Sequence, residues 1–223
     1  MRPRDAATLI LYRRKAEDIE VLMGRRSSRH AFMPNTFVFP GGRVDPEDGR
    51  VVPLADLRAP VLERLQRNAT VRRSRALGLA AIREAFEETG LAVGGPHGGA
   101  AYMDRIPDSW RPFYETGLAP RLDVLDYVFR AITPRGDVRR FHARFFLADG
   151  CHARGELGGS GELQDLQWIA IDRAVAMPAT PGVTARALEE VRRRKTGALA
   201  GESAPPVPLY HGTRYGDRVR LDP

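Results

Sequence analysis

The sequence predicts a layered α/β/α fold, because strand-like apolar segments are interleaved with helical segments along the chain. We expect strands over residues 6–12, 19–23, 36–39, 124–132, 141–148 and 166–171. We expect helices over 54–67 (interrupted by Pro60), over the segment that ends near Gly90, over one or two turns within 107–115, over 172–176 and over 184–194. This mixture of elements favours a sheet that is covered by helices.

Capping residues and glycines set the expected boundaries of these elements. Ser74 and Thr184 are candidate N-caps, and Gly90 suits the end of a helix. We expect loops over 94–99 and over the glycine-rich stretch 155–161, which we interpret as mobile. Residues 1–200 are expected to form a single domain, with a helical insertion at about 49–76, and residues 201–223 a proline-rich tail that acts as a linker or a wrapping arm.

The composition excludes several classes of protein. The 223-residue chain has no apolar run of about 18 residues that could span a membrane, and its N-terminus lacks a cleavage-like site typical of a signal peptide. The single Cys151 forbids an internal disulfide and favours a reducing cytoplasm, so we predict a cytoplasmic protein.

The net charge of +7 raises the question of nucleic-acid binding. Of the 35 basic residues, all but Lys15 and Lys195 are arginine, and they are dispersed along the chain apart from the run 192–195. That run lies at the end of a predicted helix, where cations complement the helix dipole, and we interpret it as a solvated face. We therefore expect neither a nucleic-acid partner nor a membrane.

Three carboxylates stand out in the segment before Gly90. Glu84, Glu87 and Glu88 have the spacing i, i+3, i+4, which places Glu87 and Glu88 within about 60° of Glu84, so all three share one helix face. The opposite face carries Leu79, Ile82 and Phe86. Like charges at this spacing destabilise a helix by a few tenths of a kcal/mol per pair. A hard divalent cation would make the same face favourable, since such cations prefer carboxylate oxygens.

Together with a glycine turn upstream, this helix resembles the signature of the Nudix hydrolases, G-x5-E-x7-R-E-U-x-E-E-x-G-U, in which U is apolar. Gly42 takes the first position, and Arg83 to Leu91 match the second half at every specified position. Asp48 replaces the first glutamate, and 34 residues (49–82) stand where the signature has 7, an insertion of 27. The long-insertion branch that contains the peroxisomal coenzyme A diphosphatase is also similar to this chain over 26–34, 132–134 and 139–146.

The resemblance implies a Nudix sandwich with a mixed sheet and a site for Mg²⁺ or Mn²⁺. The metal ligands that it implies are the backbone carbonyl of Gly42 and the side chains of Glu84, Glu87 and Glu88. Many relatives form dimers, so a homodimer is a further expectation from the resemblance.

The catalytic roles also follow from the resemblance. Arg83 would pair with Asp48 or with a glutamate of the helix, and thereby hold the loop against the helix. A carboxylate must orient or activate water, and families place it either on this helix or on a later loop, where Glu162 and Asp165 are the candidates and Glu162 is preferred. The catalytic set that we predict is Glu87, Glu88, Arg83 and Glu162.

Several arginines are candidates for substrate phosphates. The basic residues at 25, 26 and 29 form either a plain basic loop or a phosphate clamp, and we predict that Arg26 and Arg29 bind substrate. The coenzyme A spacing R-x3-G-x3-F-P-G-G is not met, because Ala31 and Asn35 occupy its first two positions. Arg139, Arg140 and Arg144 are equally open to a structural or a phosphate-binding role, and His142 stands where the branch has Asp. Trp110 and Trp168 are interpreted as packing residues.

These features predict a metal-dependent hydrolase that cleaves the diphosphate linkage of a nucleoside diphosphate linked to another group, X. Coenzyme A or acyl-CoA is the leading substrate, with 3′,5′-ADP and 4′-phosphopantetheine as products. ADP-ribose, NADH, dinucleoside polyphosphates and nucleoside triphosphates remain open, and a non-catalytic nucleotide- or RNA-binding module is the alternative class. We expect residues 49–82 and 94–120 to select the substrate.

Overall fold

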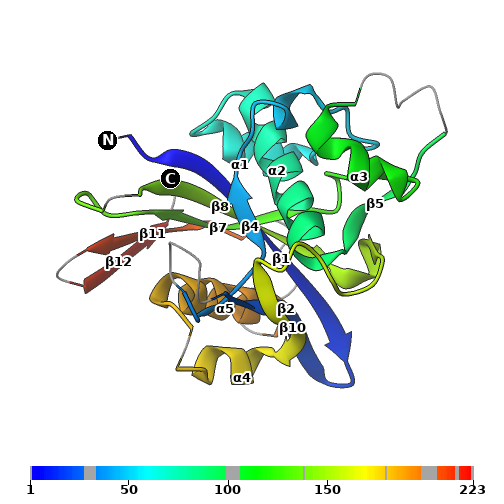
Figure 1. Cartoon of the computed structure of the whole chain (residues 1–223). Helices are drawn as coiled ribbons and strands as arrows, with labels where there is room; N and C mark the ends of the chain where they lie inside the picture. Colours follow the sequence, from blue (N-terminus) through cyan, green and yellow to red (C-terminus); the bar gives the residue numbers. More distant parts are fainter. Residues whose placement is uncertain are drawn as a thin grey trace.

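The computed structural model has a mixed β-sheet with helices on both faces (Figure 1), so the predicted α/β/α fold class is confirmed. It describes residues 2–27, 34–98, 106–137, 139–178, 180–196, 205–213 and 216–221. Side chains alternate between the two faces of the central strand. Leu9 and Leu11 enter the core under α1 (Ala59–Gln66) and α2 (Val71–Thr89), whereas Ile10 enters the core under α4 (Ile171–Ala176) and α5 (Gly182–Lys195).

The large sheet has the strand order β10-β2-β1-β8-β7-β11-β12, with β3 added to β2 and β4 added to β1. Its strands are β1 (Arg4–Lys15), β2 (Asp18–Arg26), β3 (Phe37–Val38), β4 (Gly41–Arg43), β7 (Asp126–Ile132), β8 (Phe141–Asp149), β10 (Leu163–Ala170), β11 (Pro208–Thr213) and β12 (Gly216–Leu221). The β1–β8 and β7–β11 pairs are parallel and the other pairs are antiparallel, which makes the sheet mixed.

A second, small sheet joins β5 (Ala92–Pro96), β6 (Leu118–Pro120) and β9 (Ala153–Arg154) in the order β6-β5-β9. The expected loop 94–99 is therefore wrong for its first three residues, which belong to β5. Gly94 explains the difference, because a Cβ there would lie 2.5 Å from the carbonyl oxygen of Ala119. Gly94 therefore permits a close approach between β5 and β6 and does not mark a turn.

The helices divide between the two faces of the large sheet, and Figure 1 shows α1, α2 and α3 on one side and α4 and α5 on the other. They are α1 (Ala59–Gln66), α2 (Val71–Thr89), α3 (Arg111–Glu115), α4 (Ile171–Ala176) and α5 (Gly182–Lys195), with 3-10 turns η1 (Asp48–Arg50), η3 (Asp108–Trp110) and η4 (Gly150–His152). Among the described helices, none combines the length and the apolar character needed to cross a membrane.

Two of the three predicted helix boundaries are wrong. Helix α2 begins after Thr70, which has an extended backbone and whose side-chain oxygen accepts the N–H of Arg73. Ser74 lies within the helix, and its hydroxyl donates to the carbonyl of Thr70. Helix α5 begins at Gly182 after Pro181, so Thr184 is not its N-cap. Gly90 does end α2, with a left-handed φ of 76°.

The inserted residues 49–82 lengthen the helix that carries the carboxylates. They contain most of η1, all of α1 and the N-terminal part of α2, upstream of Arg83. Gly78, within the insertion, lets α2 approach the segment that follows β6 closely, because a Cβ there would lie 3.1 Å from Leu122 and 3.3 Å from Leu125. The insertion thus adds a helix, α1, that contacts α2.

The proline-rich tail joins the large sheet. Strand β11 pairs in parallel with β7, and β12 pairs with β11. Val207 and Leu209 are buried, and Arg194 donates a hydrogen bond to the carbonyl of Pro206 at 2.7 Å. The expectation of a linker is wrong for this segment, because its strands satisfy the backbone groups of the β7 edge.

Candidate active site

A glycine turn lies directly against the carboxylates of α2. Strand β4 pairs with the first half of β1 and brings Gly41 and Gly42 to the helix. The backbone N–H of Gly41 donates to Oε2 of Glu88 at 2.8 Å. A Cβ on Gly42 would lie 2.4 Å from the carboxyl carbon of Glu84, so no other residue fits without displacing that carboxylate.

Arg83 joins the glycine-turn segment to the helix. Its guanidinium is 4% exposed and donates to both oxygens of Asp48, at 2.9 and 3.2 Å. It also donates to Glu84 at 3.0 Å, to Glu87 at 3.2 and 3.3 Å, and to the carbonyl of Arg43 at 3.0 Å. The two pairings considered from the sequence, with Asp48 and with a helix glutamate, are therefore made at the same time. Burial by itself lowers the pKa of Arg83, but Asp48, Glu84 and Glu87 outweigh it and raise the pKa.

Asp48 is fully buried and has further donors. Its Oδ2 accepts the N–H of Asp45 at 2.8 Å, and its Oδ1 accepts the indole N–H of Trp110 at 3.0 Å. Trp110 packs in the core, as expected, but it also contacts the signature residue. The sequence carried no signal for this contact, because 62 residues separate Trp110 from Asp48.

Burial sets the electrostatics of the carboxylates. It raises the pKa of Glu88 to about 8; Glu84 and Glu162 add to the rise, and the Gly41 N–H and Arg26 oppose it. Burial also raises the pKa of Glu84 to about 7, with Glu87 and Asp48 adding to the rise and Arg83 opposing it. Ionised carboxylates in this position are costly without a counter-charge, which is typical of a functional site.

The glycine-rich segment 155–161 packs on the C-terminal end of α2. The N–H groups of Gly158 and Ser160 donate to the carbonyls of Thr89 and Glu87, at 2.9 and 2.7 Å. A Cβ on Gly159 would lie 2.5 Å from the carbonyl oxygen of Glu88. The glycines thus allow a close approach that satisfies the last carbonyls of the helix, and the mobility of the segment stays a prediction.

Comparison with known proteins agrees with this geometry. Neither the known family models nor the curated proteins gave a match to the sequence. Among solved structures, a Nudix hydrolase from Alicyclobacillus acidocaldarius is 28% identical, with a TM-score of 0.62 over 85% of this chain and 90% of that one. MutT proteins from Bacillus halodurans and Methanosarcina mazei Go1 share the fold at 16% and 14% identity, each with a TM-score of 0.51, over 99% and 88% of this chain and 98% and 99% of theirs.

The chain has the Nudix hydrolase fold. With its signature residues gathered at one place, it is an enzyme of the Nudix diphosphohydrolase class. Helix α2 is called the Nudix helix from here on. The similarity does not extend to a branch, so the likeness to the coenzyme A diphosphatases still depends on the sequence alone.

The donor chemistry of the Nudix helix fits a hard divalent cation. Glu84, Glu87 and Glu88 supply carboxylate oxygens, and Glu84 touches the Gly42 backbone. Within the described part of the chain, however, no three acidic, His or Cys side chains converge as a ready metal cluster. The reason is that Arg83 attracts Glu84 and Glu87, while Glu88 bonds Gly41. The raised pKa values of Glu84 and Glu88 favour a cation, because its charge would stabilise their ionised forms.

Arg26 and Glu162 lie beside the Nudix helix. Arg26 ends β2 and is partly buried; burial lowers its pKa, and Glu88, Glu162 and Glu84 oppose that effect. Glu162 precedes β10, and its carbonyl accepts the N–H of Ser27 at 3.2 Å. The structure therefore brings Arg26 and Glu162 to Glu88, whereas Arg29 lies outside the described residues.

The other base candidate and the neighbouring arginine form a pair of their own. Arg25 donates to the carboxylate of Asp165 at 2.8 Å, and a second nitrogen of the same guanidinium lies 2.7 Å from it. Asp165 also has a left-handed φ of 52°, at the irregularity in the β10–β2 pairing. Of the two later carboxylates considered, Glu162 is the one whose charge acts on Glu88 of the Nudix helix.

The arginines of β8 and the preceding turn make structural contacts. Arg140 donates to the carbonyls of Thr133 and Pro134, and Arg144 donates to Asp5 at 2.7 Å and to the carbonyl of His142 at 3.0 Å. Arg139 is exposed. Burial, with Arg144 and Arg130, lowers the pKa of His142 to about 3, so its imidazole is neutral at ordinary pH.

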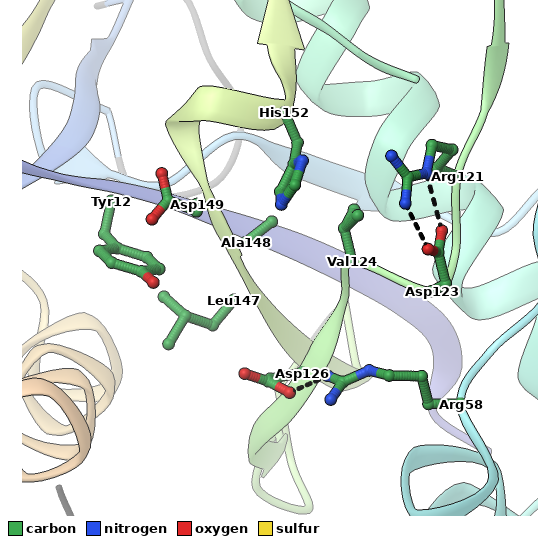
Figure 2. A pocket seen from close by; sticks show the side chains of 10 residues that line it. All are labelled: Tyr12, Arg58, Arg121, Asp123, Val124, Asp126, Leu147, Ala148, Asp149 and His152. Carbon is green, nitrogen blue, oxygen red and sulfur yellow. Dashed lines mark hydrogen bonds and ion pairs between the residues drawn. The ribbon is translucent and has the colours of Figure 1, made fainter. Parts of the chain in front are cut away.

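A cavity of about 340 Å³ lies away from the Nudix carboxylates (Figure 2). It opens at the far ends of β1 and β8, where Tyr12 is opposite Asp149. Along β1, Tyr12 is about 16 Å from Ala7, which pairs with Gly42. Two of its arginines, Arg58 and Arg121, are already paired with aspartates of the same cavity. We therefore assign the catalytic site to the Nudix helix and not to this cavity.

Proposed function

We propose that the protein hydrolyses the diphosphate linkage of a nucleoside diphosphate linked to X, in a reaction that depends on Mg²⁺ or Mn²⁺. The observation that carries this proposal is the contact of Glu84 with Gly42 and of Glu88 with Gly41, beside the buried Arg83. Nudix hydrolases in general use divalent cations. Such an arrangement concentrates oxygen ligands where a charged diphosphate would otherwise be repelled.

The residues of the chain divide the work among themselves. Glu84, Glu87, Glu88 and the Gly42 carbonyl would hold the cation, which when bound would neutralise charge on the diphosphate and make its phosphorus easier to attack. Arg83 holds the loop that carries Asp48 against the Nudix helix, through its hydrogen bonds to Asp48. We assign Glu162 to orient the attacking water and accept its proton, because it lies beside Glu88 and Arg26. The products would be a nucleoside monophosphate and phospho-X.

Coenzyme A or an acyl-CoA is the substrate that we propose first. The support is the likeness of 26–34, 132–134 and 139–146 to the long-insertion branch, together with the position of Arg26 beside the Nudix helix. Arg26 would bind a substrate phosphate, and Arg29 is proposed for the same role from the sequence. Water would then release 3′,5′-ADP and 4′-phosphopantetheine. ADP-ribose, NADH and dinucleoside polyphosphates are the competing substrates.

A substrate panel tests this proposal. Release of products from coenzyme A, acetyl-CoA, ADP-ribose, NADH and diadenosine polyphosphates is measured with Mg²⁺, with Mn²⁺ and with EDTA. We expect the highest kcat/KM on coenzyme A or acetyl-CoA and no turnover in EDTA. A higher kcat/KM on another compound of the panel would contradict the proposed substrate but not the proposed type of reaction. A complete lack of turnover would favour the non-catalytic alternative, and steeply salt-dependent RNA affinity would then identify an RNA-binding module.

The ligand role of Glu87 has a matched control. Glu87→Gln removes one charge and should lower kcat by at least about 100-fold without unfolding the protein, because a ligand and a transition-state contact are lost together. Glu189→Gln is the control, since Glu189 is 40% exposed and paired with a helical arginine, as Glu87 is at 41%. Near-normal activity of Glu87→Gln would contradict the assignment, whereas Glu189→Gln should behave as the unmutated enzyme.

A further inference from the structure

We propose that Trp110 is a positioning residue for the Nudix site, which fixes Asp48 through its indole N–H and, through Asp48, fixes Arg83. This inference rests on the proposed function for its kinetic consequence, but the contact itself does not. Neither the family signature nor the sequence spacing points to a residue at this place, because Trp110 lies outside both halves of the signature.

The hydrogen bonds of Asp48 show what the indole contributes. Its Oδ1 accepts Nε of Arg83 at 2.9 Å and Nε1 of Trp110 at 3.0 Å. Its Oδ2 accepts Nη2 of Arg83 at 3.2 Å and the N–H of Asp45 at 2.8 Å. Each oxygen thus has two donors, and the indole completes the set on a carboxylate that has 0% exposure. A buried carboxylate with all its acceptor sites used is held in one orientation.

The shorter side chain of Asp48 gives this contact its reason. Aspartate has one methylene fewer than the glutamate of the signature, so its carboxylate stays closer to its own backbone and has fewer rotamers. The indole reaches it there from a fully buried position, with ring centroids 5.4 Å from Phe113 and 6.5 Å from Tyr114. Because the ring is packed on these neighbours, its N–H has a fixed direction and can hold the loop that carries Asp48 in one position.

Two further contacts come from the same segment. The hydroxyl of Ser109 donates to the carboxylate of Glu47, next to Asp48. The ring of Phe113 packs edge-on against Phe86 of the Nudix helix, with centroids 5.3 Å apart. Residues 106–115 therefore hold both the loop and the helix that Arg83 joins. They belong to the 94–120 segment that we expect to select the substrate, so they connect substrate selection with the alignment of Arg83.

The kinetic test uses the two tryptophans of the chain. Trp110→Phe keeps a packed ring and removes the donor. Trp168→Phe is the control, because the ring of Trp168 lies under the guanidinium of Arg13 and is not among the donors to Asp48 given above. We expect Trp110→Phe to lower kcat by about 10- to 100-fold and to change KM little, because losing a hydrogen bond that supports a site residue typically costs that much activity. The control, Trp168→Phe, should keep the kcat of the unmutated enzyme. Equal kcat for Trp110→Phe and the unmutated enzyme would overturn the proposal.

A rescue experiment separates positioning from a packing defect. Asp48→Glu should lower kcat when Trp110 is present, because the longer side chain meets the indole. In the Trp110→Phe background the same change should restore kcat by at least about 5-fold, since the longer carboxylate regains Arg83 without the indole. Effects that simply multiply would show that Trp110 does not act through Asp48.

An NMR measurement tests the contact without any turnover. With two tryptophans, the ¹⁵N-labelled protein has two indole N–H signals, and Trp168→Phe assigns them. We expect the Trp110 indole proton to be protected from exchange, and Asp48→Asn to shift its signal but not that of Trp168. Rapid exchange, or no shift, would overturn the proposal. This measurement also decides the matter if Trp110→Phe does not fold or if no substrate is cleaved; protection without turnover would keep the contact and reject the proposed function.

Discussion

Two buried glutamates, Glu88 and Glu190, lie on helices that cover opposite faces of the sheet, and they differ in what surrounds them. Their exposed fractions are 5% and 3%. Glu190 accepts hydrogen bonds from Arg193 at 3.0 Å and Arg194 at 2.7 Å, both on its own helix. Glu88 accepts one backbone N–H, and two of its charged neighbours are further carboxylates, Glu84 and Glu162.

The comparison separates a structural carboxylate from a functional one. Burial raises the pKa of both residues, but for Glu190 the two arginines oppose it, so its charge is compensated within the chain. For Glu88, neighbouring carboxylates raise the pKa further, so a cation from solution would stabilise its ionised form. A buried carboxylate beside guanidinium groups stabilises a fold, whereas one beside other carboxylates marks a site.

The same comparison corrects the interpretation of the basic run 192–195. We expected a solvated face, but the side chain of Arg194 is only 7% exposed, and Lys195 donates to the hydroxyl of Tyr12 at 2.9 Å. Arg192 pairs with Asp172 at 3.3 Å. Arg194 and Lys195 are thus engaged within the chain, whereas Arg192 and Arg193 are about half-exposed, so the interpretation as a solvated face is wrong for only part of the run.

The largest effect should come from removing the charge of Glu88. Glu88→Gln keeps an oxygen for the Gly41 N–H and should lower kcat by at least about 100-fold. Its melting temperature should stay the same or rise, because a buried charge with like-charged neighbours is lost. Kinetics and calorimetry on the purified variant check both. A Glu88→Gln variant that is active but less stable would show that Glu88, like Glu190, has a structural role, and would contradict the distinction between them.

An intermediate effect, on stability alone, is expected for Glu190. Glu190→Gln leaves Arg194 buried without its carboxylate, so it should lower the free energy of unfolding by about 2 kcal/mol, or the melting temperature by roughly 4–8 °C. Hydrolysis per folded molecule should not change. Urea unfolding beside a kinetic assay measures both, and a large loss of kcat would contradict a purely structural role.

The smallest effect is a dependence of stability on pH in the metal-free protein. A carboxyl whose pKa is raised on folding binds its proton more tightly in the folded chain. The contribution of Glu84 and Glu88 is therefore complete below about pH 4.5 and is lost as pH rises through about 7 and about 8. We expect the melting temperature to fall by roughly 5 °C between pH 5 and 9.

Two controls sharpen this measurement. Glu88→Gln should flatten the pH dependence, and Glu189→Gln should not. Added Mg²⁺ should raise the melting temperature most at high pH, because a cation competes with the proton for the same oxygens. A melting temperature that rises with pH in the absence of metal would contradict the raised pKa values of this pair.

Local sequence determined the fold class, the acidic face of the Nudix helix, the glycine turn and the helix end at Gly90. Each depends on the spacing of a few neighbouring residues, and such spacing fixes periodicity and turns directly. Local signals were weaker where two residues could do the same job. Thr70 and Ser74 are both good caps, and the choice between them depends on where the chain leaves extended backbone, which the structure places at Thr70.

Only the tertiary structure decided which distant groups meet. It brought Trp110 to Asp48, laid the glycines of 155–161 on the end of the Nudix helix, and added β11 to β7. It also decided that Glu88 and Glu190, both glutamates on helices, have different surroundings. Burial and long-range contact depend on how layers pack, and no local pattern of residues contains that information.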